Sequence, residues 1–263
     1  MQHQLSAHKA LSRYIAFTGK EILEIGGAQS CESAYPFLSD GASRAVVTGL
    51  DHISHEKVDS DHDLVVMRAD ALNLDSIFGP CSFDVVYGLS IVEHIVNPDR
   101  FLSQVHAVLK PGGVAYFEGN PIWSSPKGHH LWVATWGGAY QHKATSNYLF
   151  SEFQGEISTN PLPDWSHLLM TPDEMGTYLT ELSLPLTDVD CILEWVFHNE
   201  ELNRLDMSSI ARGYSSSPLN VLEANTLRVE VPALTLEALR AKCGGGVDYG
   251  VYGVSYVLTK SPS

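Results

Sequence analysis

Residues 22–30 read ILEIGGAQS, an apolar strand that runs into two glycines and then into a helical stretch. Glycine suits such a turn because a Cβ would keep a ligand from lying against the backbone. The helix that follows presents free N–H groups in its first turn, and these attract polar or anionic ligands. The stretch therefore predicts the first strand of an α/β sheet, with a ligand-binding turn at its carboxyl end.

The spacing of these glycines disfavours two common nucleotide sites. A dinucleotide fingerprint requires Gly-x-Gly-x-x-Gly, but Ala28 and Cys31 occupy the second and third glycine positions when counting starts at Gly26. No Gly-Lys-Ser/Thr ending follows, which excludes a P-loop.

Outward from this turn, strand-like and helix-like segments alternate, which is typical of a parallel sheet with helices on both faces. The expected strands are 21–25, 45–50, 64–68, 83–87, 114–117 and 251–258, and strand character is also expected over 186–196. The expected helices are 5–17, 31–38, 100–109, 171–182, 200–210 and 235–242. Thr171, Pro172 and Glu174 predict a capped start for the helix at 171.

Composition excludes several classes of protein. The 263 residues are 44% hydrophobic and 18% charged, as in an ordinary globular protein. A formal charge of -15 argues against nucleic acid or an anionic membrane as partner. The start lacks the apolar core of a signal peptide and no stretch reads as a membrane span, so we expect a cytoplasmic protein. The four scattered cysteines predict reduced thiols.

Acidic residues stand where further strands of the expected sheet end. Asp51 ends the second strand, 25 residues beyond Gly26, where a carboxylate can accept hydrogen bonds from a ribose diol. Asp70 and Ala71 follow the third strand and suit an adenine amino group. The fourth strand lies in the stretch 83–90, FDVVYGLS, and is followed by IVEH at 91–94. The fifth strand is preceded by LKPGG at 109–113. Each feature alone is ordinary turn chemistry, but their order along the chain indicates one site.

In these residues the chain resembles the class I S-adenosylmethionine-dependent methyltransferases, in particular the UbiE-like and methyltransferase-11-like small-molecule branch. The resemblance implies a Rossmann-like, seven-stranded, mostly parallel sheet whose antiparallel last strand is 251–258. It implies S-adenosyl-L-methionine as cofactor, with contacts from Glu24, Gly26, Gly27, Ala28, Asp51, His52, Asp70, Ala71, Ser90 and His94. The family's usual third glycine is absent near Ala28 and Ser30, where small residues still permit a close backbone approach.

We expect a single methyltransferase domain over 1–263. It begins with an N-terminal helix within 1–20, followed by the cofactor-binding half at 21–119. Residues 120–170 are rich in Trp, His, Gly, Pro and Ser without a hydrophobic period, which predicts an acceptor-side insertion forming a lid. The C-terminal half, 171–263, completes the sheet and carries a second, lid-like insertion near 199–246.

The acceptor is expected to be a small molecule methylated on O or N by in-line displacement. His129 and His130 follow a turn at 123–128 and are the candidate general bases, although loop imidazoles more often bond to backbone. Aromatic and polar side chains expected to contact the acceptor are Trp123, Trp132, Trp136, Tyr140 and Asn120. No metal is expected, because His129, His130 and His142 lack a zinc-ligand spacing.

Two other hypotheses about the function remain. The chain could be a catalytically silent relative that keeps the fold for binding alone. The acidic residues retained at all the expected cofactor positions argue against such a loss of activity. A nicotinamide oxidoreductase is disfavoured by the glycine pattern and by the lack of a Tyr-x-x-x-Lys pair. For the assembly, a homodimer is a further hypothesis.

Overall fold

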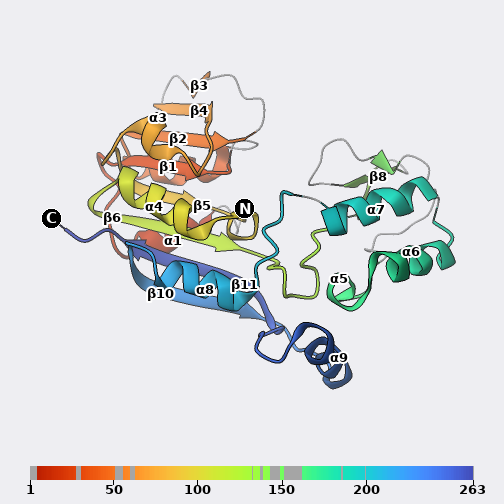
Figure 1. Cartoon of the computed structure of the whole chain (residues 1–263). Helices are drawn as coiled ribbons and strands as arrows, with labels where there is room; N and C mark the ends of the chain where they lie inside the picture. The colour runs from red at the N-terminus through yellow and green to blue at the C-terminus, as the bar shows by residue number, and fades with distance from the viewer. Residues whose placement is uncertain are drawn as a thin grey trace. The chain divides into compact units, whose positions relative to one another are not determined.

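The computed structural model describes residues 5–27, 31–50, 56–59, 63–131, 133–136, 139–142, 149–150, 162–184, 186–198 and 200–262 (Figure 1). Over 56–59, 133–136, 139–142 and 149–150 it describes the backbone alone. The chain divides into two compact units. The first unit comprises 1–120, 208–227 and 253–263, and the second comprises 121–207 and 228–252.

The first unit is built on an eight-stranded sheet with the order β10-β11-β6-β5-β1-β2-β4-β3 (Figure 1). Its strands are β1 (Glu21–Ile25), β2 (Arg44–Gly49), β3 (Glu56–Asp59), β4 (Leu64–Arg68), β5 (Phe83–Gly88), β6 (Leu109–Gly119), β10 (Asn220–Arg228) and β11 (Val251–Thr259).

The pairing confirms the predicted Rossmann-like sheet. Parallel pairs join β1 to β2, β1 to β5, β2 to β4 and β5 to β6, while β11 runs antiparallel to β6, as expected of the last strand. The short β3, which the sequence analysis did not identify, adds an antiparallel edge beside β4 and makes the eighth strand.

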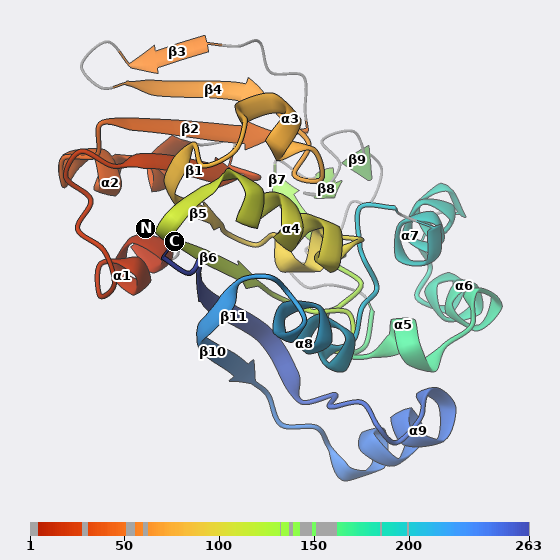
Figure 2. The ribbon, with the colours of Figure 1, turned by 60° about the vertical axis from the view of Figure 1, so that its left-hand side comes forward.

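Helices cover both faces of this sheet, as predicted (Figure 2). They are α1 (Ser6–Leu11), α2 (Tyr35–Ser39), α3 (Leu74–Phe78), α4 (Pro98–Val108) and α8 (Met207–Ser215), with short 3-10 turns η2 (Cys31–Ser33) and η3 (Val92–His94). None of the helices in the described ranges is long and apolar enough to cross a membrane.

Side-chain alternation along the strands assigns α1 and α2 to one face of the sheet and α4 and α8 to the other. Tyr87 and Tyr116 belong to one buried core with apolar residues of α1 and α2. On the opposite face, Phe117 meets Phe101 of α4 with ring centroids 4.8 Å apart. Tyr256 pairs across the strands with Phe117 and stacks on Tyr214 of α8 at 4.0 Å.

The second unit holds a three-stranded antiparallel sheet and its own helices. Its strands are β7 (Val133–Trp136), β8 (Ala139–His142) and β9 (Leu149–Phe150), and its helices are α5 (Ser166–Leu169), α6 (Pro172–Glu181), α7 (Leu186–His198) and α9 (Ala233–Cys243). α6 and α7 pack through a core that includes Met175, Leu179, Ile192 and Trp195. The capping box predicted at Thr171 is confirmed, with Glu174 as its acidic partner.

Several predicted elements were wrong. Residues 186–196 form the helix α7 and not a strand, and the buried positions Val189, Ile192 and Trp195 recur with a helical spacing. The helix expected from 200 begins only at Met207, and α1 ends at Leu11 instead of 17. β10 was missed because nearly all of its residues are exposed, which leaves no alternating pattern to read.

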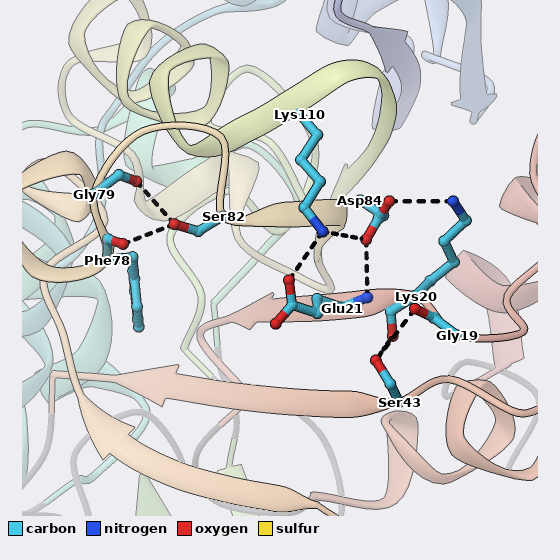
Figure 3. A network of polar contacts seen from close by, with 9 residues as sticks. All are labelled: Gly19, Lys20, Glu21, Ser43, Phe78, Gly79, Ser82, Asp84 and Lys110. Carbon is cyan, nitrogen blue, oxygen red and sulfur yellow. Dashed lines mark hydrogen bonds and ion pairs between the residues drawn. The ribbon is translucent and has the colours of Figure 1, made fainter.

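An ion-pair network joins the amino ends of β1, β5 and β6 (Figure 3). Asp84 accepts hydrogen bonds from Lys110 Nζ at 2.7 Å, from the backbone N–H of Glu21 at 3.0 Å and from Lys20 Nζ at 3.2 Å. Lys110 Nζ also donates to Glu21 at 2.9 Å. Burial by itself would raise the pKa of Asp84, but the hydrogen bonds from these partners outweigh it and lower that pKa.

We expect Asp84→Asn to destabilise the fold by about 1–3 kcal/mol, because it removes a charge-assisted acceptor from three partly buried donors. Since the pKa of Asp84 is lower in the folded state, its contribution is fully present at neutral pH. The contribution is lost as the pH falls from about 4 through the lowered folded value. Urea unfolding of both proteins across this pH range measures the difference. Glu237→Gln, at an exposed position of α9, is the control. A gap between wild type and D84N that does not narrow in acid would contradict the network's role.

Candidate active site

Among the described residues, the carboxyl ends of the parallel strands are followed by several that the sequence analysis assigned to one site, which are Gly26, Gly27, Asp70, Ala71 and Ser90. The backbone N–H of Gly26, after β1, donates to Thr48 O of β2 at 2.8 Å. The N–H of Ala69, after β4, donates to Gly49 O at 3.0 Å. These bonds hold the three strand ends at one edge of the sheet, where ligands bind in open α/β folds.

Glu24 is a buried carboxylate within β1, with 3% of its surface exposed. Tyr87 of β5, its direct cross-strand partner, donates a hydrogen bond from Oη to Glu24 Oε2 at 2.6 Å. Ser33 Oγ lies 2.6 Å from both carboxylate oxygens. Strand β1, strand β5 and the turn η2 are therefore tied together by a single side chain.

The glycine turn lies directly on this carboxylate. A Cβ at Gly27 would stand 2.1 Å from Glu24 Oε1, so only glycine fits while Glu24 keeps its place. Gly26 has φ +84°, in the left-handed region that glycine adopts without strain. The sequence analysis expected glycines for ligand approach, and the structure adds that Gly27 is required by the acid beneath it.

Burial raises the pKa of Glu24, while the hydrogen bonds from Ser33 and Tyr87 act in the opposite direction. Burial and the neighbouring Glu24 carboxylate raise the pKa of Tyr87 well above its usual value. The phenol therefore stays protonated and serves as a donor to Glu24.

Asp70 and Ala71 follow β4 at the same edge. Asp70 Oδ1 accepts the N–H of Leu72 at 2.8 Å, and Oδ2 accepts the side-chain amide of Asn73 at 3.0 Å. Arg100 braces this turn by donating to Leu72 O at 2.9 Å. The carboxylate is thus oriented by its own turn, and each of its oxygens retains a further lone pair for a ligand.

The segment after β5 closes against the end of β1. A Cβ at Gly88 would lie 2.8 Å from Ile91 Cγ2 and 3.1 Å from Ile25 O, so the strand ends approach closely. Ser90 follows with φ +49°, a strained value for a residue with a side chain. His94 ends the turn η3. The N–H of Asn120, after β6, donates to Glu93 Oε1 at 3.1 Å.

Some expected site residues lie outside the described residues. These are Ala28, Asp51, His52 and Trp132, so their predicted contacts stay predictions. Trp136 and Tyr140 belong to the paired strands β7 and β8, where the backbone alone is described.

The candidate bases lie in the second unit and are buried. His129 is fully buried, and its Nδ1 accepts the N–H of Leu131 at 3.0 Å. His130 is 6% exposed, has φ +52°, and places Nδ1 2.9 Å from Gly128 O. Because a carbonyl only accepts, this nitrogen of His130 is the protonated one, and the ring's lone pair is on Nε2.

A third histidine, which the sequence analysis missed, packs beside them. His167 donates from Nε2 to Trp123 O at 2.7 Å, and its ring meets those of Trp123 and His129 at 4.6 and 5.2 Å. Burial lowers the pKa of His167 to about 4, so it is neutral at physiological pH. Arg204 stacks over Trp123 at 5.4 Å. His167 stands alone in a segment without a hydrophobic period, so no sequence pattern marked it as part of a cluster.

A surface pocket of about 500 Å³ occurs in the second unit among residues 228–250. Its lining includes Arg228, Arg240 and Tyr249, and it contains none of the expected cofactor or acceptor residues. We therefore do not assign the cofactor to it.

Comparison with known proteins identifies a family match over part of the chain. Residues 26–117, which span the glycine turn through β6, match the family described as "Methyltransferase domain". A ubiquinone biosynthesis O-methyltransferase of Pseudomonas syringae pv. tomato is 27% identical over 113 residues, covering 42% of this chain and 40% of that protein. One from Azoarcus sp. is 23% identical over 192 residues, covering 67% and 69%. The chain thus spans well under half the length of the first relative.

Solved structures show the same fold. An S-adenosylmethionine-dependent methyltransferase from Mesorhizobium loti superposes with a TM-score of 0.52 at 14% identity, and the match covers 95% of each chain. At this identity the likeness establishes the fold alone.

We expect Gly27→Ala to weaken binding of S-adenosylhomocysteine by about tenfold or more, because the new methyl group displaces either the turn or Glu24. Isothermal titration calorimetry measures the affinity, and circular dichroism verifies the fold. Gly245→Ala is the matched control, since a Cβ there has no heavy atom within 4 Å and φ is not in the left-handed region. Equal affinity in both variants would show that the turn does not touch the ligand.

Proposed function

We propose that this chain, which carries a class I S-adenosylmethionine-dependent methyltransferase domain, transfers a methyl group to an oxygen or nitrogen atom of a small-molecule acceptor. One observation carries the proposal: the glycine turn at 26–27 rests on the buried, hydrogen-bonded carboxylate of Glu24 at the carboxyl edge of the sheet. This is where the matching family begins in the chain.

The described residues at this edge fit the cofactor S-adenosyl-L-methionine. Gly26 and Gly27 provide a turn without side chains, and Asp70 with Ala71 provides an oriented acid beside a small residue. Ser90 and His94 follow β5, where we propose contacts to the methionine portion. Ala28, Asp51 and His52 complete the proposed set from the sequence.

When bound, the cofactor supplies an electrophilic methyl group on a sulfonium. The chain's part is to hold its binding groups in place. Tyr87 and Ser33 keep the Glu24 carboxylate fixed beneath the turn, so the turn needs no rearrangement on binding. Such preorganisation lowers the cost of ordering the site.

We favour oxygen as the acceptor atom, because the curated relatives that match are O-methyltransferases. A hydroxyl loses its proton as the new bond to carbon forms, so a base near it accelerates transfer. A carbon acceptor lacks such an acidic proton unless it is activated. Trp123, Trp132, Trp136, Tyr140 and Asn120 are the side chains that we propose contact the acceptor.

Of the two candidate bases, hydrogen bonding favours His130. Its Nδ1–H donates to Gly128 O, which leaves the basic lone pair on Nε2. In His129 the lone pair is on Nδ1 and already accepts the N–H of Leu131. The strained backbone of His130 also suits a residue held for function.

In the direct test, the purified full chain is incubated with S-adenosylmethionine and a panel of small hydroxylated compounds, each matched with its amine analogue. We expect mass spectrometry to find a product heavier by one methyl group, with an equal amount of S-adenosylhomocysteine. Products from hydroxyl compounds alone support oxygen as the acceptor. If the cofactor binds but no compound of a broad panel is methylated, the result favours a catalytically silent relative that only binds. If the cofactor does not bind, the proposal is wrong.

With an acceptor in hand, His130→Asn should lower kcat by about 10²- to 10⁴-fold, because the amide preserves the bond to Gly128 but lacks Nε2. His129→Asn is the matched control, since its amide oxygen still accepts the N–H of Leu131. Full turnover in both variants would show that neither His129 nor His130 is the general base.

A further inference from the structure

The strand β10 forms one end of the eight-stranded sheet. Among the residues that the structure describes, no strand pairs with its outer edge. β10 is nine residues long, and eight of these positions are exposed, with Glu223 half-buried. An edge of this length presents a row of unpaired backbone donors and acceptors.

β10 lacks the usual protection against pairing with another chain. Edge strands are commonly guarded by proline, by lysine or by a bulge, and NVLEANTLR contains neither of those residues. Its acid, Glu223, is already engaged by Arg13, whose guanidinium donates at 2.8 Å, and it also accepts from Tyr14. Its arginine, Arg228, is held by both oxygens of Asp248 at 2.9 and 3.0 Å.

Apolar side chains are exposed on both faces of the strand. Val221 and Leu227 share a face with Glu223 because they are an even number of residues from it, and their exposed fractions are 41% and 57%. Leu222, 41% exposed, lies on the opposite face. A neighbouring strand would cover parts of all three side chains.

We infer that β10 is the interface for a second copy of this chain, paired antiparallel edge to edge so that the sheet continues across the dimer. A two-fold axis normal to the sheet keeps each face on its own side, so odd-numbered residues meet odd-numbered residues. The axis passes at Ala224, which sets Val221 opposite Leu227 of the second copy and Glu223 opposite Asn225.

Charge and hydropathy select this register. Moving the axis to Glu223 would place the two Glu223 carboxylates opposite each other, and like charges directly opposite are destabilising. Moving it to Asn225 would set Glu223 opposite the apolar Leu227. Of these three registers, only the axis at Ala224 both sets Val221 opposite Leu227 and leaves each acid facing an amide. This self-complementarity favours a second copy over an unrelated extended peptide.

Sedimentation velocity of the full chain over a concentration series tests the interface. We expect a monomer–dimer equilibrium in the wild type, and a dissociation constant at least about tenfold higher for Val221→Lys or Leu227→Lys. Both positions are exposed, so thermal melts should show that the fold is kept. Leu234→Lys, at an 82% exposed site on α9, is the control and should leave the equilibrium unchanged.

Paired substitutions test the register itself. Val221→Lys combined with Leu227→Glu puts opposite charges face to face on both sides of the axis, and we expect it to restore the dimer. Val221→Lys combined with Leu227→Lys places like charges there and should stay monomeric. A wild type that is monomeric throughout, or a dimer indifferent to these substitutions, would overturn the interface. Equal behaviour of the two double variants would overturn the register.

Discussion

The buried carboxylate of Glu24 determines where the glycine turn can lie, and the rest of the cofactor edge is arranged around it. Burying a carboxylate is costly unless its oxygens are hydrogen-bonded. Here Ser33 and Tyr87 supply those bonds from a turn and from the neighbouring strand, and Gly27 covers the acid from above. The same contacts that offset the desolvation cost also fix the turn, so stability and the proposed ligand binding depend on one group of atoms.

The polar groups at the amino and carboxyl ends of the parallel strands differ in what they bind. At the amino edge, the carboxylates of Asp84 and Glu21 pair with Lys110, and Asp84 also accepts from Lys20, which holds the starts of β1, β5 and β6 together. At the carboxyl edge, polar groups such as Asp70 are oriented by their own turns and retain capacity for a ligand. The ion pairs that join the strand starts are thereby kept at the opposite end of the strands from the groups proposed to bind the cofactor.

The second unit holds the histidines that we propose for the acceptor chemistry. Its histidines differ in proton placement: backbone contacts put the lone pair of His130 on Nε2 and that of His129 on Nδ1. Burial keeps His167 neutral beside them. Function on such a fold resides in the site grafted onto it, which is why the acceptor is proposed from these residues and not from the sheet.

The sequence alone determined which segments form the parallel strands, because strands buried on both faces read as apolar runs and their ends as glycines and acids. It misassigned α7, whose Val189 and Ile192 suit a strand as well as a helix, and it missed β10, whose exposure leaves no pattern. Only the tertiary structure joined Glu24 to Tyr87, 63 residues away, and gave His130 its basic nitrogen. Such contacts depend on strand register and backbone direction, which residue types and spacing do not encode locally.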